Sequence, residues 1–407
     1  MKNKSLIQKY NLQTPITYLF FLSAAILIIF YFTNRPLEDN YISPEAAKLG
    51  NTGADDSLIV SRVLLIGDAG APSSNKKEPV LSALQKQLSK LNNRSFVVFL
   101  GDNIYPYGMP DVKAVDRQDA EKRITEQLNV LIESNSKGVF LPGNHDWAQG
   151  SENGWLNAKN LQKFINSKYS PQIKYLPENG CPGPSVIEVG GKVKIIVLDS
   201  QWWLQPGNKP KSNCKYNSEK KVVDALDSIL YAFHDDLVII TAHHPLASYG
   251  PHGGYFSWKD HIFPLLNIYP SLWIPLPIIG SAYPLSRMIG ISPQDISNST
   301  YQNYINEIEG VLSKHNNIIY ASGHEHSLQV LKGINNSVYL ISGFGTSTHS
   351  VEIIKGENMW FGASKPGFMQ VDLYNDENVQ ITIFEVDKYS NPIKVFSFCP
   401  FMKNENS

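Results

Sequence analysis

Residues 62–70 read RVLLIGDAG, an apolar, strand-forming run that passes directly into a glycine and an aspartate. The same arrangement returns as FVVFLGDNIY at residues 96–105 and as VFLPGNHD at residues 139–146. It returns twice more, as LVIITAHHP at residues 237–245 and as IIYASGHEH at residues 318–326. Polar clusters at the carboxyl ends of parallel strands meet at one edge of an open α/β sheet. We therefore expect these five clusters to line one crevice.

Helical patterns lie between several of these apolar runs. Residues 80–91, 124–132 and 222–233 each repeat apolar side chains at the three-to-four spacing of one helix face. Strands that alternate with helices predict an α/β fold whose sheets are largely parallel and buried on both faces. The alternating runs at residues 368–373 and 379–386 predict a closing β-hairpin.

The composition is that of an ordinary globular protein. Of the 407 residues, 42% are hydrophobic and 18% charged, which excludes a disordered or low-complexity chain. The formal net charge of -1 supplies no general field that would attract nucleic acid, and no nucleic-acid binding surface is evident. An anionic substrate must therefore be held by a local site such as a metal centre.

The N-terminal part departs from this average. Residues 16–32, ITYLFFLSAAILIIFYF, are almost wholly apolar and predict a transmembrane helix within a tail and anchor at residues 1–35. Lys2, Lys4 and Lys9 precede the run, so the positive-inside rule predicts a cytoplasmic N-terminus and a catalytic domain on the outer side, periplasmic or luminal. A cleaved signal peptide is the alternative, although no small-x-small cleavage site follows the run.

The rest of the chain divides into a linker and one domain. Residues 36–57 are polar and show no sustained period, which is typical of a tether. Residues 58–407 alternate strand and helix patterns without a break in composition, so we expect one catalytic domain.

The residue types in the five clusters suit phosphoryl chemistry. Carboxylate, amide, phenol and imidazole groups together form a ligand set for two transition metals. Two neighbouring cations need a shared carboxylate that offsets their repulsion, a role that suits Asp102. A water bound to such cations has a pKa lowered toward neutrality, so a hydroxide nucleophile exists at working pH.

The ordered motifs GDxG, GDNxY, GNHD, HHP and GHxH resemble those of the calcineurin-like metallophosphoesterases. Within that superfamily the chain is similar to the purple, tartrate-resistant type of acid phosphatase. It has Gly70 where general members have a histidine, and it has Tyr105 where the purple branch has a tyrosine. The resemblance runs from Arg62 to the C-terminus. It implies a four-layer α-β-β-α sandwich.

The resemblance also implies seven metal ligands. It places Asp68, Tyr105 and His326 on a first metal, expected to be Fe(III), and Asn144, His243 and His324 on a second, divalent Fe, Zn or Mn, with Asp102 between the two metals.

Three further residues are assigned to catalysis by the same resemblance. His145 is expected to contact phosphate or donate a proton, with Asp146 as the partner that orients it. His252 matches a second active-site histidine.

Two features depart from the animal phosphatases. Cys181 and Cys214 flank one strand and form either a disulfide or two free thiols. An insert at residues 260–300 contains the apolar stretch LWIPLPII, residues 272–279, whose prolines prevent a spanning helix. The insert lies on a bilayer, caps the crevice or packs on the core.

These observations predict a membrane-anchored phosphatase with two metals that hydrolyses phosphomonoesters by attack of a metal-bound hydroxide. The alternative is a phosphodiesterase or pyrophosphatase that acts on nucleotides or lipid head groups. A membrane-displayed binding module without activity is disfavoured, because every ligand motif is intact.

Overall fold

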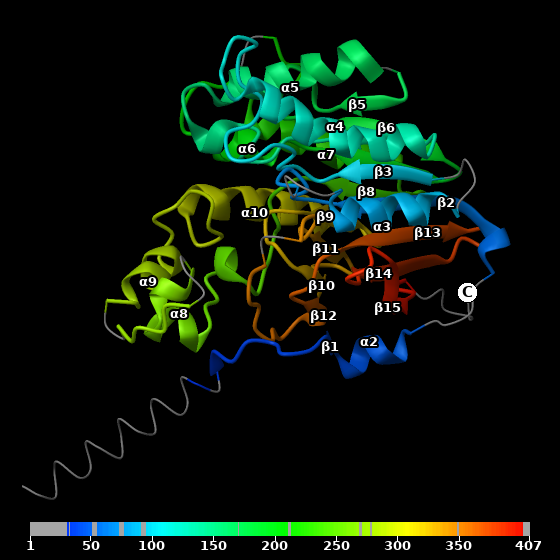
Figure 1. Ribbon diagram of the computed structural model, residues 1–407. Helices are drawn as coiled ribbons and strands as arrows, with labels where there is room; N and C mark the ends of the chain where they lie inside the picture. Colours follow the sequence, from blue (N-terminus) through cyan, green and yellow to red (C-terminus); the bar gives the residue numbers. More distant parts are fainter. Residues whose placement is uncertain are drawn as a thin grey trace, which may run out of the picture.

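The computed structural model describes residues 31, 33–50, 55–72, 77–90, 95–169, 171–210, 213–267, 271–276, 279–347 and 350–401 (Figure 1). The strands are β1 (Tyr41–Ile42), β2 (Ile59–Ile66), β3 (Ser95–Phe99), β4 (Lys137–Phe140), β5 (Ile173–Tyr175), β6 (Ser185–Gly190), β7 (Val193–Val197), β8 (Leu237–Thr241), β9 (Ile319–Ser322), β10 (Leu328–Lys332), β11 (Val338–Ser342), β12 (Met359–Ala363), β13 (Gly367–Tyr374), β14 (Val379–Val386) and β15 (Pro392–Phe398). The helices are α2 (Pro44–Lys48), α3 (Pro79–Leu88), α4 (Arg117–Glu133), α5 (Gly154–Tyr169), α6 (Ser200–Leu204), α7 (Glu219–Ala232), α8 (Trp258–Ile262), α9 (Ala282–Met288) and α10 (Ser299–Leu312). Short 3-10 helices lie at Asp56–Leu58, Ala148–Gly150, Glu178–Gly180, Pro251–Gly253 and Pro264–Asn267.

The strands form two sheets. One has the order β15-β14-β13-β2-β3-β4-β5, in which β2 to β5 are parallel. The other has the order β1-β12-β10-β11-β9-β8-β7-β6, with a parallel centre of β7, β8, β9 and β11. Ile66 lies opposite Phe99, and Phe99 lies opposite Phe140, so β2, β3 and β4 end at the same height. The polar clusters that follow them therefore begin side by side.

Three hydrophobic clusters show four layers. Alternate residues of both sheets, such as Val98 and Ile239, pack against one another in the centre. The other face of the first sheet packs against α3, α4 and α5, for example through Leu84 and Leu128. The other face of the second sheet packs against α6, α7 and α10. The predicted α/β class with two helix-covered sheets is confirmed.

Local sequence explains where the helices begin. Pro79 starts α3, where its missing N–H is not needed. The Ser218 hydroxyl accepts a hydrogen bond from the Lys221 N–H and caps α7, and the Asn298 side chain caps α10 in the same way. These caps fix the starts of the two helices that cover the second sheet.

The N-terminal part of the described chain packs on the domain. Residues 36–57 were expected to be a tether, yet β1 pairs with β12 and α2 buries Ala46. The hairpin of β13 and β14 forms as predicted. Cys181 and Cys214 are joined by a disulfide, the first of the two alternatives.

The predicted membrane topology needs correction. A helix that crosses a bilayer needs about 20 mostly apolar residues. The longest described helix, α4, has 17 residues and carries several charged side chains, and none of the described helices is long and apolar enough to cross a membrane. Apart from Tyr31, residues 16–32, from which the transmembrane helix and the single-pass localisation were predicted, lie outside the described residues.

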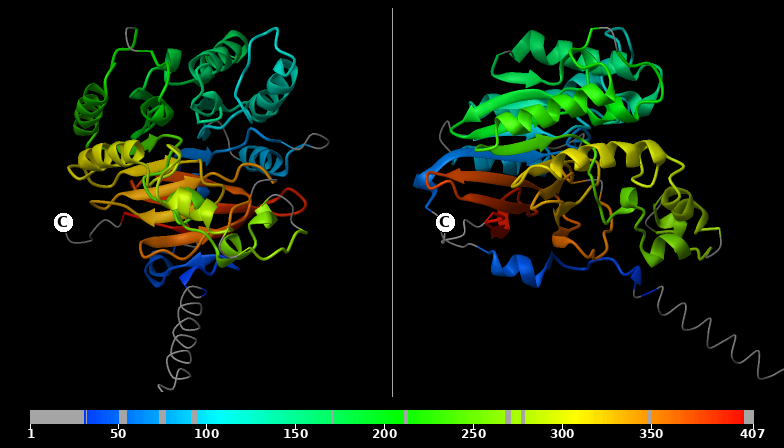
Figure 2. Two further views of the ribbon diagram at one scale, coloured as in Figure 1. Left: turned by 90° about the vertical axis from the view of Figure 1, so that its left-hand side faces the viewer. Right: turned by 180° about the vertical axis from the view of Figure 1, so that it is seen from behind.

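The insert lies at the end of the molecule toward which β3 points, as the two views of Figure 2 also show for α8 and α9. Its last part returns to the strand ends, where the Ile296 N–H donates to the His252 carbonyl at 2.9 Å. Of the three placements considered for the insert, contact with the crevice is the one that this hydrogen bond favours.

Candidate metal centre

The loops that carry the predicted ligands have unusual backbone conformations. Asp68, Asp102 and His324 have φ angles of 58°, 53° and 69°, a region that non-glycine residues rarely adopt. Such conformations persist only where the surroundings hold them, and they cluster at functional sites. Here the Asp68 carboxylate accepts the His324 N–H at 2.8 Å, and the Asp68 N–H donates to the Gly101 carbonyl at 3.0 Å. The strained loops thus support one another.

Two glycines allow these loops to approach closely. A Cβ atom on Gly143 would overlap the carboxylate and main-chain nitrogen of Asp102, and one on Gly70 would overlap the Asp102 carbonyl. Both positions therefore require the absence of a side chain.

The first group of predicted ligands surrounds the Tyr105 hydroxyl. Its oxygen lies 3.0 Å from Asp68 Oδ1, 3.1 Å from Asp102 Oδ2 and 3.0 Å from His326 Nε2. Burial, together with the charges of the two aspartates, raises the pKa of Tyr105 well above its usual value. Two carboxylates and an imidazole thus surround one hydroxyl, a group of donors rich in negative charge.

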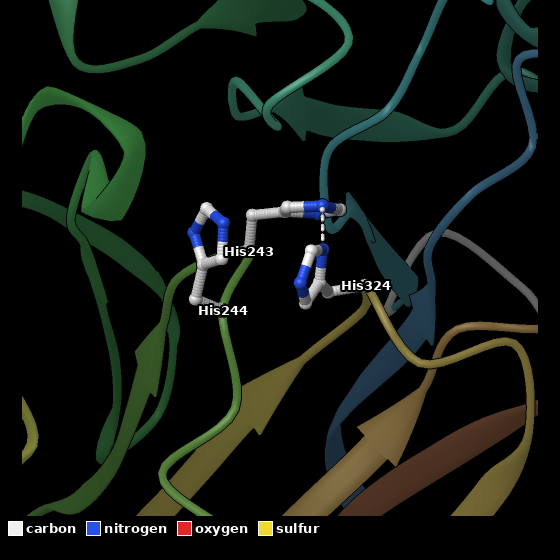
Figure 3. Close-up of side chains that lie close together, drawn as sticks. All are labelled: His243, His244 and His324. Atoms are coloured by element: carbon white, nitrogen blue, oxygen red, sulfur yellow. Dashed lines mark hydrogen bonds between the residues drawn. The ribbon is translucent and has the colours of Figure 1, made fainter. Parts of the chain in front are cut away.

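The second group brings three lone pairs together. His243 Nδ1 faces the Leu100 carbonyl at 2.8 Å and must donate to it, so Nε2 of the neutral ring is bare. His324 Nε2 faces the Gln294 carbonyl at 2.9 Å, so its Nδ1 is bare in the same way. These two bare nitrogens lie 3.3 Å apart, joined by the dashed line of Figure 3. Asn144 Oδ1 lies 3.0 Å from the first and 3.1 Å from the second.

Asp102 lies between the two groups. Its Oδ2 atom is 3.1 Å from the Tyr105 hydroxyl and 3.4 Å from His243 Nε2. Burial alone would raise the pKa of the Asp102 carboxyl, but the neighbouring His243 and His145 lower it well below its usual value. Conversely, burial opposes the charging of His243, and Asp102 raises the pKa of that histidine to about 9.

The donor set fits metal cations. Three acceptor atoms in mutual contact are unfavourable unless a positive charge lies among them, and the raised pKa of His243 shows a proton taking part of that role. Carboxylate, amide and imidazole ligands are those that iron, zinc and manganese accept.

His244 lies beside this cluster but is engaged elsewhere. The Ser200 hydroxyl lies 2.8 Å from His244 Nδ1, and Gln294 Oε1 lies 2.8 Å from its Nε2. Although His243, His244 and His324 are close enough to hold one ion, both ring nitrogens of His244 already have partners. Burial lowers the pKa of His244 well below its usual value, so the ring is neutral.

Of the predicted catalytic residues, His145 and Asp146 diverge. His145 Nδ1 lies 2.7 Å from the Pro106 carbonyl, and its Nε2 lies 3.9 Å from Asp102 Oδ2. Asp146 is buried and accepts hydrogen bonds from the main chain of Asn103 and Gly143. The structure shows the Pro106 carbonyl as the group that orients the His145 ring, and Asp146 as a brace between two ligand loops.

His252 is packed on the second group. Its ring centroid lies 3.8 Å from that of His324, and its N–H donates to Glu325 at 3.0 Å. Glu325, the middle residue of GHEH, is buried and also accepts a hydrogen bond from the Ser248 hydroxyl. It therefore ties the loop of His252 to the loop of His324 and His326.

Sequence analysis missed Gln294, which lies in the insert. Its carbonyl faces His324 and its side chain faces His244, so it contacts both histidines. No motif surrounds it in the sequence, and only the folding of the insert brings it to the site.

Comparisons with known proteins agree with this geometry. Residues 61–274 match the family model described as calcineurin-like phosphoesterase. Among solved structures, the GAP50 anchor of the inner membrane complex of Plasmodium aligns with a TM-score of 0.50 and 16% identity over 86% of this chain and 90% of that one. Purple acid phosphatase PPD1 of yellow lupin, Lupinus luteus, aligns with a TM-score of 0.50 and 14% identity over 84% of this chain, which spans about half (53%) of that one. At these identities the likeness concerns the fold. No curated protein matches the chain.

Proposed function

The chain belongs to the calcineurin-like phosphoesterase family, and on that premise we propose that it is a phosphatase that hydrolyses phosphomonoesters with two metal ions. The family implies a phosphate-ester substrate and the two ions. The proposal that the preferred substrate is a monoester rests on the resemblance to the purple acid phosphatases, in particular on Tyr105.

The position of Asp102 carries this proposal. One oxygen of its carboxylate faces the phenol of the first group at 3.1 Å and an imidazole of the second group at 3.4 Å. A carboxylate so placed can be shared by two cations and reduce their repulsion. We assign Asp68, Tyr105 and His326 to the first ion and Asn144, His243 and His324 to the second.

The bound ions would supply Lewis acidity and an activated water. The chain's own residues hold the ligands and move the proton. Because His145 Nδ1 donates to the Pro106 carbonyl, its Nε2 atom is the one that can give a proton to the leaving oxygen of the ester. Asp146 keeps the loops of Asp102 and Asn144 at a fixed spacing through Asn103 and Gly143.

We propose Fe(III) for the first ion because a phenolate is its expected ligand in the purple branch. The purified protein should then show a visible charge-transfer band, and Tyr105→Phe should remove the band while far-UV circular dichroism stays unchanged. An active wild-type protein that is colourless and contains zinc or manganese without iron would contradict this assignment.

A substrate panel tests the reaction itself. Matched phosphomonoesters, phosphodiesters and pyrophosphates should be assayed with the same leaving group where possible, and the monoesters should have the highest kcat/KM. His145→Ala should lower kcat about 100-fold or more if the residue donates the proton. Preferential hydrolysis of diesters would contradict monoester specificity, and no hydrolysis by metal-loaded protein would contradict phosphatase function.

A further inference from the structure

Arg287, at the end of α9 in the insert, reaches the candidate metal centre from outside the motif loops. Its Nη2 atom lies 3.0 Å from His252 Nδ1, and the His252 ring is stacked on His324. We propose that Arg287 is a positioning residue that holds the His252 ring with Nδ1 unprotonated, so that its Nε2 carries the proton. The inference rests on the proposed function where it concerns catalysis, but the state of the ring can be measured without it.

The hydrogen bonds of Arg287 fix its direction. Its Nε lies 2.6 Å from Asp295 Oδ2, and its Nη2 lies 2.5 Å from Asp295 Oδ1, which is the two-pronged geometry of an arginine–carboxylate pair. Its Nη1 donates to the Tyr283 hydroxyl at 2.7 Å. The Asp295 side chain is fully buried, and that of Arg287 is 16% exposed. The guanidinium is therefore held firmly, with the second hydrogen of Nη2 left for His252.

A guanidinium can only donate, because it carries its charge at all working pH values and has no acceptor. A ring nitrogen 3.0 Å from Nη2 must then offer its lone pair, which leaves the ring proton on Nε2. The Gln294 carbonyl also lies 3.0 Å from His252 Nδ1 and would favour the opposite tautomer. That carbonyl already accepts from His324 Nε2 at 2.9 Å, whereas a proton on Nδ1 would point at a fixed positive charge.

Direct binding of phosphate by Arg287 is a less suitable role. Nε and one hydrogen of Nη2 are used by Asp295, so no edge of the fork is open for two-pronged contact with an anion. The Asp295 carboxylate also offsets the charge of Arg287. Arg287 thus acts through His252.

Nitrogen NMR reads the tautomer directly. The protein is labelled with ¹⁵N and loaded with Zn²⁺, which has no unpaired electrons, and His252→Ala identifies the signals of His252. We expect a bare Nδ1 and a protonated Nε2 in the wild type, and the reverse in Arg287→Met, where Nδ1 is free to donate to the Gln294 carbonyl. A protonated Nδ1 in neutral wild-type His252 overturns the proposal, even if the variant does not fold.

A double-mutant cycle tests the consequence. Arg287→Met should lower kcat about 10- to 100-fold with little change in KM, since a displaced catalytic group costs rate more than binding. In the His252→Ala background the same change should have less than about a twofold effect. Arg117→Met, which removes another partly buried arginine with a carboxylate partner on α4, should leave kcat unchanged.

Losses from Arg287→Met and His252→Ala that simply multiply in the double variant would show that Arg287 does not act through His252, and would overturn the proposal. Absence of phosphatase activity in the wild type would instead contradict the proposed function, and the NMR result would still decide the tautomer.

Discussion

The motif loops and the insert both contact the candidate metal centre, but they are built in different ways. The loops after β2, β3 and β4 are buried and hold their ligands through strained backbone, glycine contacts and main-chain hydrogen bonds. The insert exposes many apolar side chains, among them Ile289 and Ile291, and reaches the site through Gln294 and Arg287.

This difference suggests a division of labour. Backbone geometry that cannot relax determines where the ligand atoms lie, which suits atoms that must coincide with two cations. Side chains from the insert then orient the histidines around those ligands. A change in a motif loop should therefore affect metal binding and activity together, and a change in the insert should affect one property more than another.

The largest effect is expected from Gly143→Ala. The new methyl group would overlap the Asp102 carboxylate and main chain, so the shared ligand must move. A displacement of about 1 Å costs about 100-fold in rate, and we expect at least that loss in kcat/KM for a monoester. The matched control is Gly310→Ala in α10, where a Cβ would meet nothing within 4 Å.

Gly310→Ala should raise the free energy of unfolding by about 0.5–1 kcal/mol and leave activity unchanged. Activity of Gly143→Ala equal to that of this control would show that the close approach of the two loops does not position Asp102.

A smaller effect is expected from Gln294→Ala. The substitution removes the acceptor of the buried His244 Nε2–H, and a buried donor without a partner costs about 1–3 kcal/mol. The main-chain carbonyl that faces His324 remains, so kcat should stay within about fivefold of the wild type. Urea unfolding and steady-state kinetics measure the two quantities, and a large loss of activity at unchanged stability would contradict the proposed roles.

Much of the fold could be predicted because period and motif agree. β8, for example, has the bounds of the apolar run at residues 237–241. The helix α10 was missed although Tyr304, Ile308 and Val311 repeat on one face, because these residues were considered with the insert. β10 and β12 are short and lie between irregular segments, and pairing between them, rather than local pattern, defines them.

The predicted ligand residues lie together because each follows a strand end, and strand ends are visible in a sequence. The partners of His145 were less visible. Adjacent residues in a tight loop point in different directions, so Asp146 turns toward Asn103 while His145 turns toward Pro106. Gln294 and Arg287 belong to no motif, and only tertiary contacts bring them to the site.

Metal analysis of Asp102→Asn tests the central claim most directly. The wild-type chain should contain two metal ions, and replacing the shared carboxylate by a neutral amide should remove both, because their mutual repulsion is no longer offset. Asn144→Ala serves as the comparison, since it removes a ligand from the second group alone and should retain the first ion. The account predicts close to zero ions in Asp102→Asn and about one in Asn144→Ala by mass spectrometry of the folded proteins. Full occupancy of both sites in Asp102→Asn would contradict it.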